Sequence, residues 1–385
     1  MGKQVINPYA LWLTSIKGVG GLTIRALMET AENAEEVYHM SEDELRMCLS
    51  DRLKKNSDVA DKSLSIFFAQ KRDPAEEAEK LRERGIGFVS VEDDGFPDRL
   101  RGIPDCPYGI YYIRDLPPED VPCVAIIGAR NCSGYGREQA RIFAEKLALR
   151  GIAVVSGMAR GVDGIAGRAA VSAGGRSYAV LGCGVDVVYP AENRELYDIL
   201  REKGGIISEN PPGTQPRTQL FPRRNRLISG LADLVLVIEA RRRSGTVITV
   251  DAALEQGKEI FALPGRVSDA LSDGCNFLIS QGAGIACTPE SVIEHFYGVN
   301  DSGTDLFEKK RKDRNARRED LSGMEKVLFD VLECGKIMEP DYLIRRMESI
   351  LGRHIDAEDF TACMMSLQIR GLAQEIGSGH YKGMG

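Results

Sequence analysis

The sequence predicts an α/β fold: a Rossmann-like, doubly wound, mostly parallel sheet, flanked by an N-terminal helical domain and a C-terminal winged helix. Residues 124–127 and 152–155 are short apolar runs of the kind that is buried on both faces of a sheet. A helical segment connects them, which is typical of a parallel βαβ unit. Each run is followed by a glycine-containing turn, and both turns should lie at the sheet edge where open α/β sheets bind ligands.

The N-terminal region, residues 1–82, is expected to form a helical domain of the helix-hairpin-helix or SAM-like kind, because large apolar residues recur at helical spacing. Residues 16–21 read IKGVGG and have the outline of the glycine-rich hairpin of such a domain. Its N–H groups could contact a DNA phosphate, with Lys17 and Arg25 adding charge. Simple packing between helices is the commoner explanation of such a turn.

The central domain, residues 83–298, continues the strand–helix alternation after the first βαβ unit. Further strands are expected at 178–181, 205–208, 234–238 and 259–263, with helices at about 195–203 and 245–257. Together with the first two, these make about six parallel strands, the doubly wound pattern. Another strand, at 108–113, precedes them.

The C-terminal region divides into a linker, residues 299–321, and a small module, residues 322–385. The linker contains KKRKDRNARR at 309–318, which is usually solvated and disordered, although contact with nucleic acid is an alternative. Helices at 324–332, 340–347 and 357–369, followed by a hairpin at 371–382, predict a winged helix. Its third helix carries little positive charge, which favours packing or a protein contact over the reading of bases.

Composition limits the class of protein and of partner. The chain has 385 residues, a net charge of -7 and nine cysteines without a C-x-x-C pair. An acidic chain can bind nucleic acid only through local basic patches. We therefore expect a cytoplasmic protein with reduced thiols and no metal site, and no membrane association, because no apolar run is long enough to cross a bilayer.

Glycine, serine, threonine and arginine collect after the predicted strands, and this combination suits a phosphate-containing ligand. Between residues 217 and 243 there are seven arginines and two acidic residues, and 221–226 is expected to be an arginine-dense turn. Any single glycine could simply make a tight turn. The candidate binding residues are Gly128, Arg130, Ser133, Gly136, Ser156, Gly157, Arg160, Gly161, Arg168, Gly182, Gly184, Arg194, Arg223, Arg224, Asn225, Arg226, Ser244, Gly245 and Thr246.

Other phosphate-site classes and catalysis are less well supported. The chain has no G-x-x-x-x-G-K-[ST], and its first turn is not G-x-G-x-x-G, so neither a P-loop nor a dinucleotide site is indicated. Asp163, Glu209 and Glu239 could act on a glycosidic bond as paired carboxylates. No histidine occurs in these turns, and we predict no catalytic residues.

Several long motifs resemble, in order, those of the DNA-processing family called DprA or Smf. They are GARNCSGYG (128–136), SGMARGVDGIA (156–166), LGCGVDVVYPAEN (181–193), FPRRNRLISGLA (221–232), SGTVITVDAA (244–253) and LPGRVSDALSDGCNFLISQGA (263–283). The chain departs from the usual family pattern at Ala129, where serine is common, and at Gly167, where histidine is common.

The resemblance implies a non-enzymatic protein that binds single-stranded DNA, and double-stranded DNA more weakly, without a cofactor. It implies a homodimer that protects incoming DNA, works with single-stranded-DNA-binding protein and loads RecA recombinase during natural transformation or recombination. It makes Arg130 the leading DNA contact and places Arg223, Arg224 and Arg226 in the same motif set. Arg160, Arg168 and Arg194 are predicted from charge and position alone. The apolar segment 277–279 is a candidate dimer contact.

Two alternatives stay open at this point. The same phosphate pocket could belong to a phosphoribohydrolase that cleaves nucleoside monophosphates, or to a nucleotide sensor. The catalytic glutamate of such enzymes is missing from the turn at 244–249, which argues against hydrolysis. A transcription regulator acting through the winged helix is the second alternative.

Overall fold

The computed structural model divides the chain into two compact units, Met1–Val299 and Asn300–Gly385. The structure describes residues 6–53, 64–297, 321, 323–332, 337–376 and 379–383. The predicted basic linker, apart from its last residue, and the tip of the predicted C-terminal hairpin at 377–378 lie outside the described residues.

The first unit is built on a nine-stranded sheet of order β1-β2-β6-β5-β4-β3-β7-β8-β9. All pairs from β6 to β9 in this order are parallel, whereas β2 is antiparallel to both β1 and β6. The predicted doubly wound, mostly parallel fold is confirmed. The strands are β1 (Ile86–Ser90), β2 (Gly109–Arg114), β3 (Cys123–Ile127), β4 (Ala153–Ser156), β5 (Ser177–Val180), β6 (Gly205–Ser208), β7 (Leu234–Val237), β8 (Glu259–Ala262) and β9 (Gly284–Ile285).

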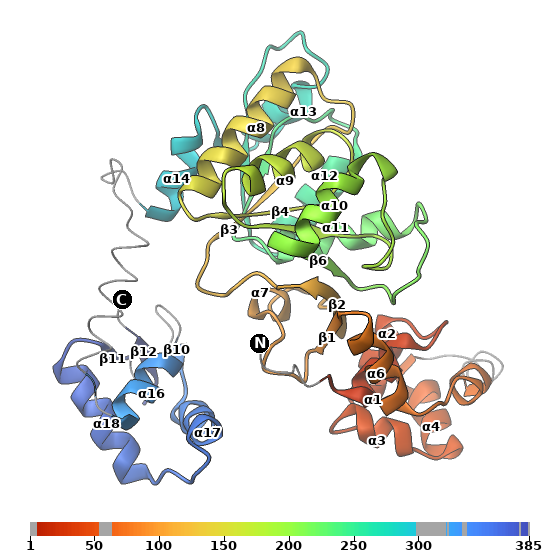
Figure 1. Ribbon diagram of the computed structural model, residues 1–385, viewed down its shortest axis with the longest axis vertical. Coiled ribbons are helices and arrows are strands. Elements are labelled where there is room, and N and C mark those ends of the chain that lie inside the picture. Colours follow the sequence, from red (N-terminus) through yellow and green to blue (C-terminus); the bar gives the residue numbers. More distant parts are fainter. Residues whose placement is uncertain are drawn as a thin grey trace. The chain divides into compact units, whose positions relative to one another are not determined.

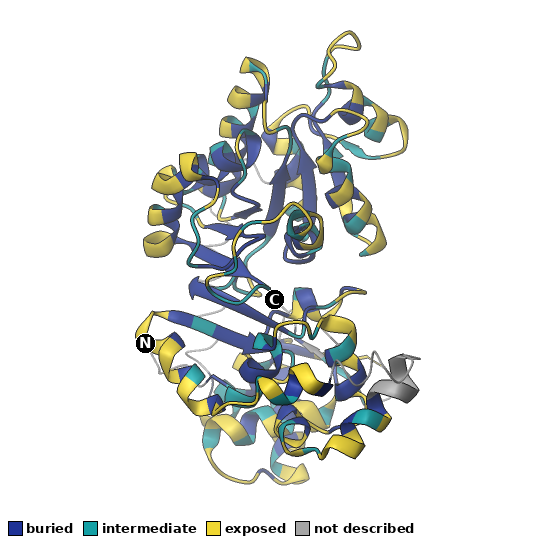
Figure 2. Cartoon of the chain, turned by 90° about the vertical axis from the view of Figure 1, so that its right-hand side faces the viewer, coloured by how far each residue is buried: buried dark blue, intermediate teal, exposed yellow. Residues whose placement is uncertain are grey.

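Both faces of the sheet are buried, which explains the uninterrupted apolar runs (Figure 2). In β3, Val124 and Ile126 belong to the core under α8 (Gly134–Leu149), α9 (Val162–Ser172) and α14 (Pro289–Tyr297). Ala125 and Ile127 point the other way, as the two-residue period of a strand requires. They join the core under α7 (Asp98–Arg101), α11 (Leu220–Gly230), α12 (Gly245–Glu255) and α13 (Asp273–Ser280).

The N-terminal helices lie beside β1 and β2 (Figure 1). They share a hydrophobic core with this antiparallel end of the sheet. They are α1 (Pro8–Ser15), α2 (Gly21–Met28), α3 (Ala34–His39), α4 (Glu42–Leu53), a helix at 64–69 and α6 (Pro74–Glu83). Trp12, fully buried, lies in the same apolar cluster as Phe88 and Tyr111 of β1 and β2, and α10 (Arg194–Lys203) contributes Leu196 to it. The structure therefore groups this region with the sheet, and the predicted boundary between residues 82 and 83 remains a prediction.

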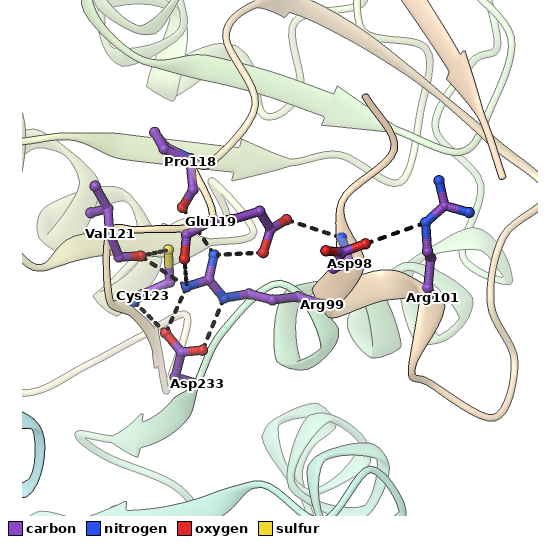
Figure 3. A network of polar contacts seen from close by, with 8 residues as sticks. All are labelled: Asp98, Arg99, Arg101, Pro118, Glu119, Val121, Cys123 and Asp233. Atoms are coloured by element: carbon purple, nitrogen blue, oxygen red, sulfur yellow. Dashed lines mark hydrogen bonds and ion pairs between the residues drawn. The ribbon is translucent and has the colours of Figure 1, made fainter. Parts of the chain in front are cut away.

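A polar network ties α7 to the beginnings of β3 and β7 (Figure 3). The Asp233 carboxylate accepts a hydrogen bond of 2.9 Å from Nε of Arg99 and one of 2.8 Å from the backbone N–H of Cys123. The same guanidinium donates to the carbonyls of Pro118 and Val121. This network lies at the amino edge of the parallel strands, opposite the carboxyl edge that carries the predicted binding residues.

The described residues of the second unit form three helices and a small antiparallel sheet, the winged-helix arrangement that the sequence predicts. The helices are α16 (Gly323–Val331), α17 (Pro340–Leu351) and α18 (Ala357–Ile369). The strands β10 (Ile337–Met338), β11 (Ala373–Glu375) and β12 (Tyr381–Gly383) form a sheet of order β10-β12-β11. Its core contains residues of this unit only. Across the described residues, no helix has the length and apolar character needed to span a membrane.

Candidate nucleic-acid interface

The turns after the parallel strands surround a cavity of about 670 Å³, which we call the rim cavity. Residues 128–131, directly after β3, form one wall, and the first turn of α12 forms another. A small adjoining recess shares Arg130, Tyr189 and Phe221 with the rim cavity. The predicted residues that line the cavity or the recess are Gly128, Arg130, Gly157, Arg160, Gly182, Arg224, Asn225, Ser244, Gly245 and Thr246.

Ser133 and Gly136 build the first turn but do not line either space. Ser133 is the N-cap of α8 and accepts a 3.0 Å hydrogen bond from the Gly136 N–H. Its own N–H and hydroxyl donate to the Glu239 carboxylate at the end of β7. A Cβ at position 136 would lie 2.3 Å from a Glu239 oxygen, so only glycine fits there. These contacts hold the loop that carries Arg130.

The second turn packs directly against the first. Gly161 has φ +74°, and a Cβ at this position would lie 2.2 Å from the Ala129 carbonyl oxygen. Ser156 is buried and donates a 2.8 Å hydrogen bond to the Ile126 carbonyl, so it joins β4 to β3. Both residues were predicted to bind phosphate, but their surroundings show a scaffold role that sets the spacing of the two turns.

The predicted arginine-dense turn at 221–226 is wrong, because these residues lie in the first two turns of α11. The helical period separates the three arginines. Arg223 is exposed, whereas Arg224 is 6% exposed and the side chain of Arg226 is 11% exposed. The three are therefore not equivalent as candidate contacts.

Arg224 is an internal brace rather than a free cation. Its guanidinium donates to the carbonyls of Gly157 and Val180, which follow β4 and end β5. Burial lowers the pKa of Arg224 to about 10, while the nearby Asp163 charge favours the protonated guanidinium. Burial raises the pKa of Asp163, and the positive charge of Arg224 opposes that shift. Arg224 thus lines the cavity, but its guanidinium donates hydrogen bonds to backbone carbonyls.

Arg226 and Arg168 are also held by the protein. Arg226 donates to Asp105 at 2.8 Å and to Glu209 at 2.7 Å. Arg168, in α9, donates to the Asn193 side chain at 3.0 Å. Neither lines the rim cavity or the recess, and Gly184 and Arg194 do not either. Arg226 and Arg168 thus have polar partners within the protein, and their predicted contact with a ligand stays a prediction.

Arg130 and Arg223 are exposed and have no acidic partner among the described residues. Arg160 is also exposed, with a weak 3.5 Å ion pair to Glu192. Such a surface pair contributes about 0–1 kcal/mol, so a phosphate could replace it easily. Together with Arg241, an exposed residue of the rim-cavity lining that was not among the predicted ones, these three cations are available to an anionic ligand near the rim.

The first turn of α12 faces the rim cavity. Ser244 is its N-cap residue, and its buried hydroxyl has no hydrogen-bond partner among the described residues. A Cβ at Gly245 would meet no atom within 4 Å, so the backbone there is open to a ligand. An open helix N-terminus beside an unpartnered hydroxyl suits a phosphate or another anion.

This site also contains an aromatic pair that the sequence motifs did not predict. The rings of Tyr189 and Phe221 stack with centroids 5.4 Å apart and an interplanar angle of 24°. Tyr189 is 40% exposed, and the Arg130 guanidinium lies 5.8 Å from the Phe221 centroid. The only sequence signal was an aromatic residue in each of two separate motifs, because their stacking depends on the packing of α11 against the turn after β5.

The three carboxylates that sequence analysis considered for acid–base chemistry are all engaged. Glu239 is 3% exposed and holds Ser133, and Glu209 accepts from Arg226. Asp163 accepts a 3.1 Å hydrogen bond from the Gly157 N–H and is buried beside Arg224. Each therefore serves the fold.

Comparison with known proteins matches the part of the chain that builds this rim. A family model described as DNA recombination-mediator protein A matches residues 87–297. Protein Smf of Escherichia coli (strain K12) is 41% identical over 216 residues, which are 56% of this chain and 58% of that protein. The chain thus matches less than two thirds of that relative's length. DNA processing protein DprA of Streptococcus pneumoniae is 40% identical over 207 residues, 54% of this chain and 73% of that protein.

Solved structures of DprA proteins are similar to this chain as well. The X-ray structure of DprA from Streptococcus pneumoniae superposes with a TM-score of 0.64 at 32% identity, covering 75% of this chain and 98% of that one. DprA from Helicobacter pylori, whose structure is described as showing a single-stranded DNA binding mode, gives a TM-score of 0.50 at 30% identity and covers 55% of this chain and 95% of that one. The family model covers more than half of the chain, including every turn of the rim, and the resemblance found in the motifs is confirmed: the chain belongs to the DNA recombination-mediator protein A family.

Proposed function

We propose that this protein binds single-stranded DNA along the rim cavity and acts as a recombination mediator without catalysing a reaction. One observation carries the proposal: the exposed, unpaired Arg130 lies over the ring of Phe221, which stacks on the exposed Tyr189. Proteins that bind single strands combine cations for the backbone with aromatic rings on which bases stack. The geometry offers both at the mouth of one cavity.

The surrounding groups suit the phosphate backbone. Arg160 and Arg223 add exposed positive charge, and the first turn of α12 supplies an open helix N-terminus. The whole chain carries a net charge of -7, so attraction of DNA depends on this local group. Because the exposed arginines are confined to one edge of an acidic protein, DNA should bind along that edge and not over the whole surface.

The partners belong to the same proposal. The family's description as a recombination mediator and the single-stranded DNA binding mode described for the Helicobacter pylori protein support single-stranded DNA as the ligand. We propose a cytoplasmic homodimer that binds double-stranded DNA more weakly, accepts DNA beside single-stranded-DNA-binding protein and loads RecA recombinase. Phe277, in the segment 277–279 suggested as a dimer contact, is 37% exposed and lies under the Arg242 guanidinium.

A nucleotide sensor or nucleoside monophosphate hydrolase is the second candidate, because the open first turn of α12 would also hold one phosphate. Against hydrolysis, the acidic residues near the rim are held by the fold, as described above. Incubation with nucleoside monophosphates, followed by chromatography for free base, distinguishes a hydrolase from a protein that only binds. Release of base would overturn the non-catalytic proposal.

The direct test of DNA binding is fluorescence anisotropy of labelled oligothymidylate over a salt series. Arg130→Ala is expected to weaken binding and to reduce the slope of log affinity against log salt by about 0.7 per lost phosphate contact. Arg176→Ala is the matched control, since Arg176 is exposed just before β5, at the opposite edge of the sheet. Equal affinities for Arg130→Ala and wild type would contradict the proposal.

A further inference from the structure

A second cavity, of about 750 Å³, lies on the other side of the N-terminal part of α11. We call it the hairpin cavity. It is lined by the glycine-rich hairpin at 16–21, by the segment 209–215 after β6, and by Arg217 and Arg223. The hairpin was recognised in the sequence as a possible phosphate contact, and the rim cavity gives it no role.

The charge of the hairpin cavity is positive. Lys17, Arg217 and Arg223 are exposed and make no ion pair with any described residue. Glu209 also lines the cavity, but its carboxylate is already bound by Arg226 at 2.7 Å. Among the described residues, no free carboxylate therefore balances the cations at this cavity.

The hairpin backbone is open towards a ligand. In the described part of the chain, nothing accepts a hydrogen bond from the N–H of Gly20, and no side chain caps α2. A Cβ at Gly20 or Gly21 would meet no atom within 4 Å. Gln70 fixes the hairpin from behind, accepting from the Lys17 N–H at 2.9 Å and donating to the Lys17 carbonyl at 3.0 Å.

The hairpin region and α11 both place an arginine beside the Asp105 carboxylate. Arg25, in α2, lies 3.8 Å from Asp105, which also pairs with Arg226 of α11 at 2.8 Å. Arg226 in turn pairs with Glu209 after β6. This chain of charges connects the helical region, the loop after α7, α11 and the sheet, so the hairpin cavity has walls from elements that are tied together.

The two cavities are separated only by the beginning of α11. Phe221 and Pro222 line the rim cavity, Leu220 and Arg223 line the hairpin cavity, and Arg224 reaches both. A flexible anionic chain lying on Phe221 would therefore cross one helical turn to reach Arg223 and then Arg217. Few other ligands have the length and the repeated charge to fill both spaces.

We propose that the strand bound at the rim continues over the N-terminal turn of α11 into the hairpin cavity. There its phosphates contact Arg217, Lys17 and the N–H groups of the glycine-rich hairpin. The N-terminal helical region is then a second section of one continuous single-strand site. This inference rests on the proposed function and extends it from the rim to a part of the chain outside the parallel sheet.

The test uses the full-length protein and labelled oligothymidylates of about 4 to 16 nucleotides, the range of site sizes of compact single-strand-binding domains. Affinity of the wild type should rise in two stages, the second when the strand is long enough to reach the hairpin cavity. Lys17→Ala and Arg217→Ala should match the wild type on the shortest strands that bind. On long strands each should weaken binding several-fold and reduce the salt slope by about 0.7.

Lys146→Ala is the matched control, because Lys146 is exposed on α8 and lines neither cavity. Circular dichroism and thermal unfolding of each variant exclude a general loss of fold. If Lys17→Ala and Arg217→Ala behave like Lys146→Ala at every length while Arg130→Ala still weakens binding, the continuous site is overturned and the proposed function survives. If Arg130→Ala has no effect at any length, the proposed function fails and this inference fails with it.

Discussion

At the scale of single residues, neighbouring arginines in α11 have opposite roles. Arg224 is buried and donates to two backbone carbonyls, whereas Arg223 is exposed between the two cavities. A buried cation that loses its partners, or a buried carboxylate that loses its cation, is far costlier than the same change at the surface. The two positions therefore separate stability from ligand binding.

We expect Arg224→Ala to lower the free energy of unfolding by about 3–5 kcal/mol, because it leaves Asp163 buried without the opposing charge. Arg223→Ala should change stability by no more than about 0.5 kcal/mol, as for most exposed positions, and should weaken single-strand binding. Urea denaturation gives the first quantity and fluorescence anisotropy the second. An Arg224→Ala variant as stable as the wild type would show that the guanidinium does not stabilise the fold.

At the scale of elements, the two turns after β3 and β4 form one structural piece. Gly161 lets the second turn approach the Ala129 carbonyl, and Glu239 holds the first turn from the end of β7. The position of Arg130 therefore depends on contacts among three strands that are adjacent in the sheet. A substitution that alters the contact between the turns should therefore displace the Arg130 guanidinium while leaving the arginine itself in place.

Gly161→Ala should lower the free energy of unfolding by about 1–3 kcal/mol, the cost of a strained backbone conformation. It should also weaken DNA binding. Gly174→Ala is the control, because Gly174 has φ +82° but its Cβ would meet no atom within 4 Å. That control should lose stability through strain alone and keep its affinity. Equal DNA affinity for the two variants would contradict the coupling of the turns.

At the scale of the whole molecule, the chain has separate cores in its two units. The buried apolar residues of the sheet and the N-terminal helices all lie between Ile6 and Ile293 in the chain, and those of the C-terminal cluster lie between Leu321 and Ala373. The single tryptophan, Trp12, is fully buried in the first unit. Its fluorescence therefore reports the unfolding of that unit alone.

A fragment of residues 1–299 should fold without the C-terminal unit, because it retains its core. Its tryptophan fluorescence should follow the same urea midpoint as the full chain, and it should keep the affinity that depends on Arg130. A matching midpoint with a lost affinity would place part of the DNA site in the C-terminal unit. A much lower midpoint would show that the two units stabilise each other.

The class of the fold and the edge of the sheet with the candidate site could both be predicted from the amino-acid sequence. Buried parallel strands must be apolar throughout, and glycine-containing turns after them must meet at their carboxyl ends. Those two constraints are local, so the strands from β3 to β8 and the turns at 128 and 157 could be predicted. The antiparallel pairing of β2 with β6 could not, because it depends on a contact between distant segments.

Which candidate residues are exposed and which are buried follows from the packing of the elements and could not be predicted. The helical phase of α11 buries Arg224 and exposes Arg223, which the turn predicted for 221–226 concealed. The Tyr189–Phe221 stack and the approach of Lys17 to α11 join residues far apart in the chain. Residue type and spacing predict a phosphate site. The exposure of each side chain, its ion pairs and its neighbours depend on how the elements pack, which is a property of the folded chain.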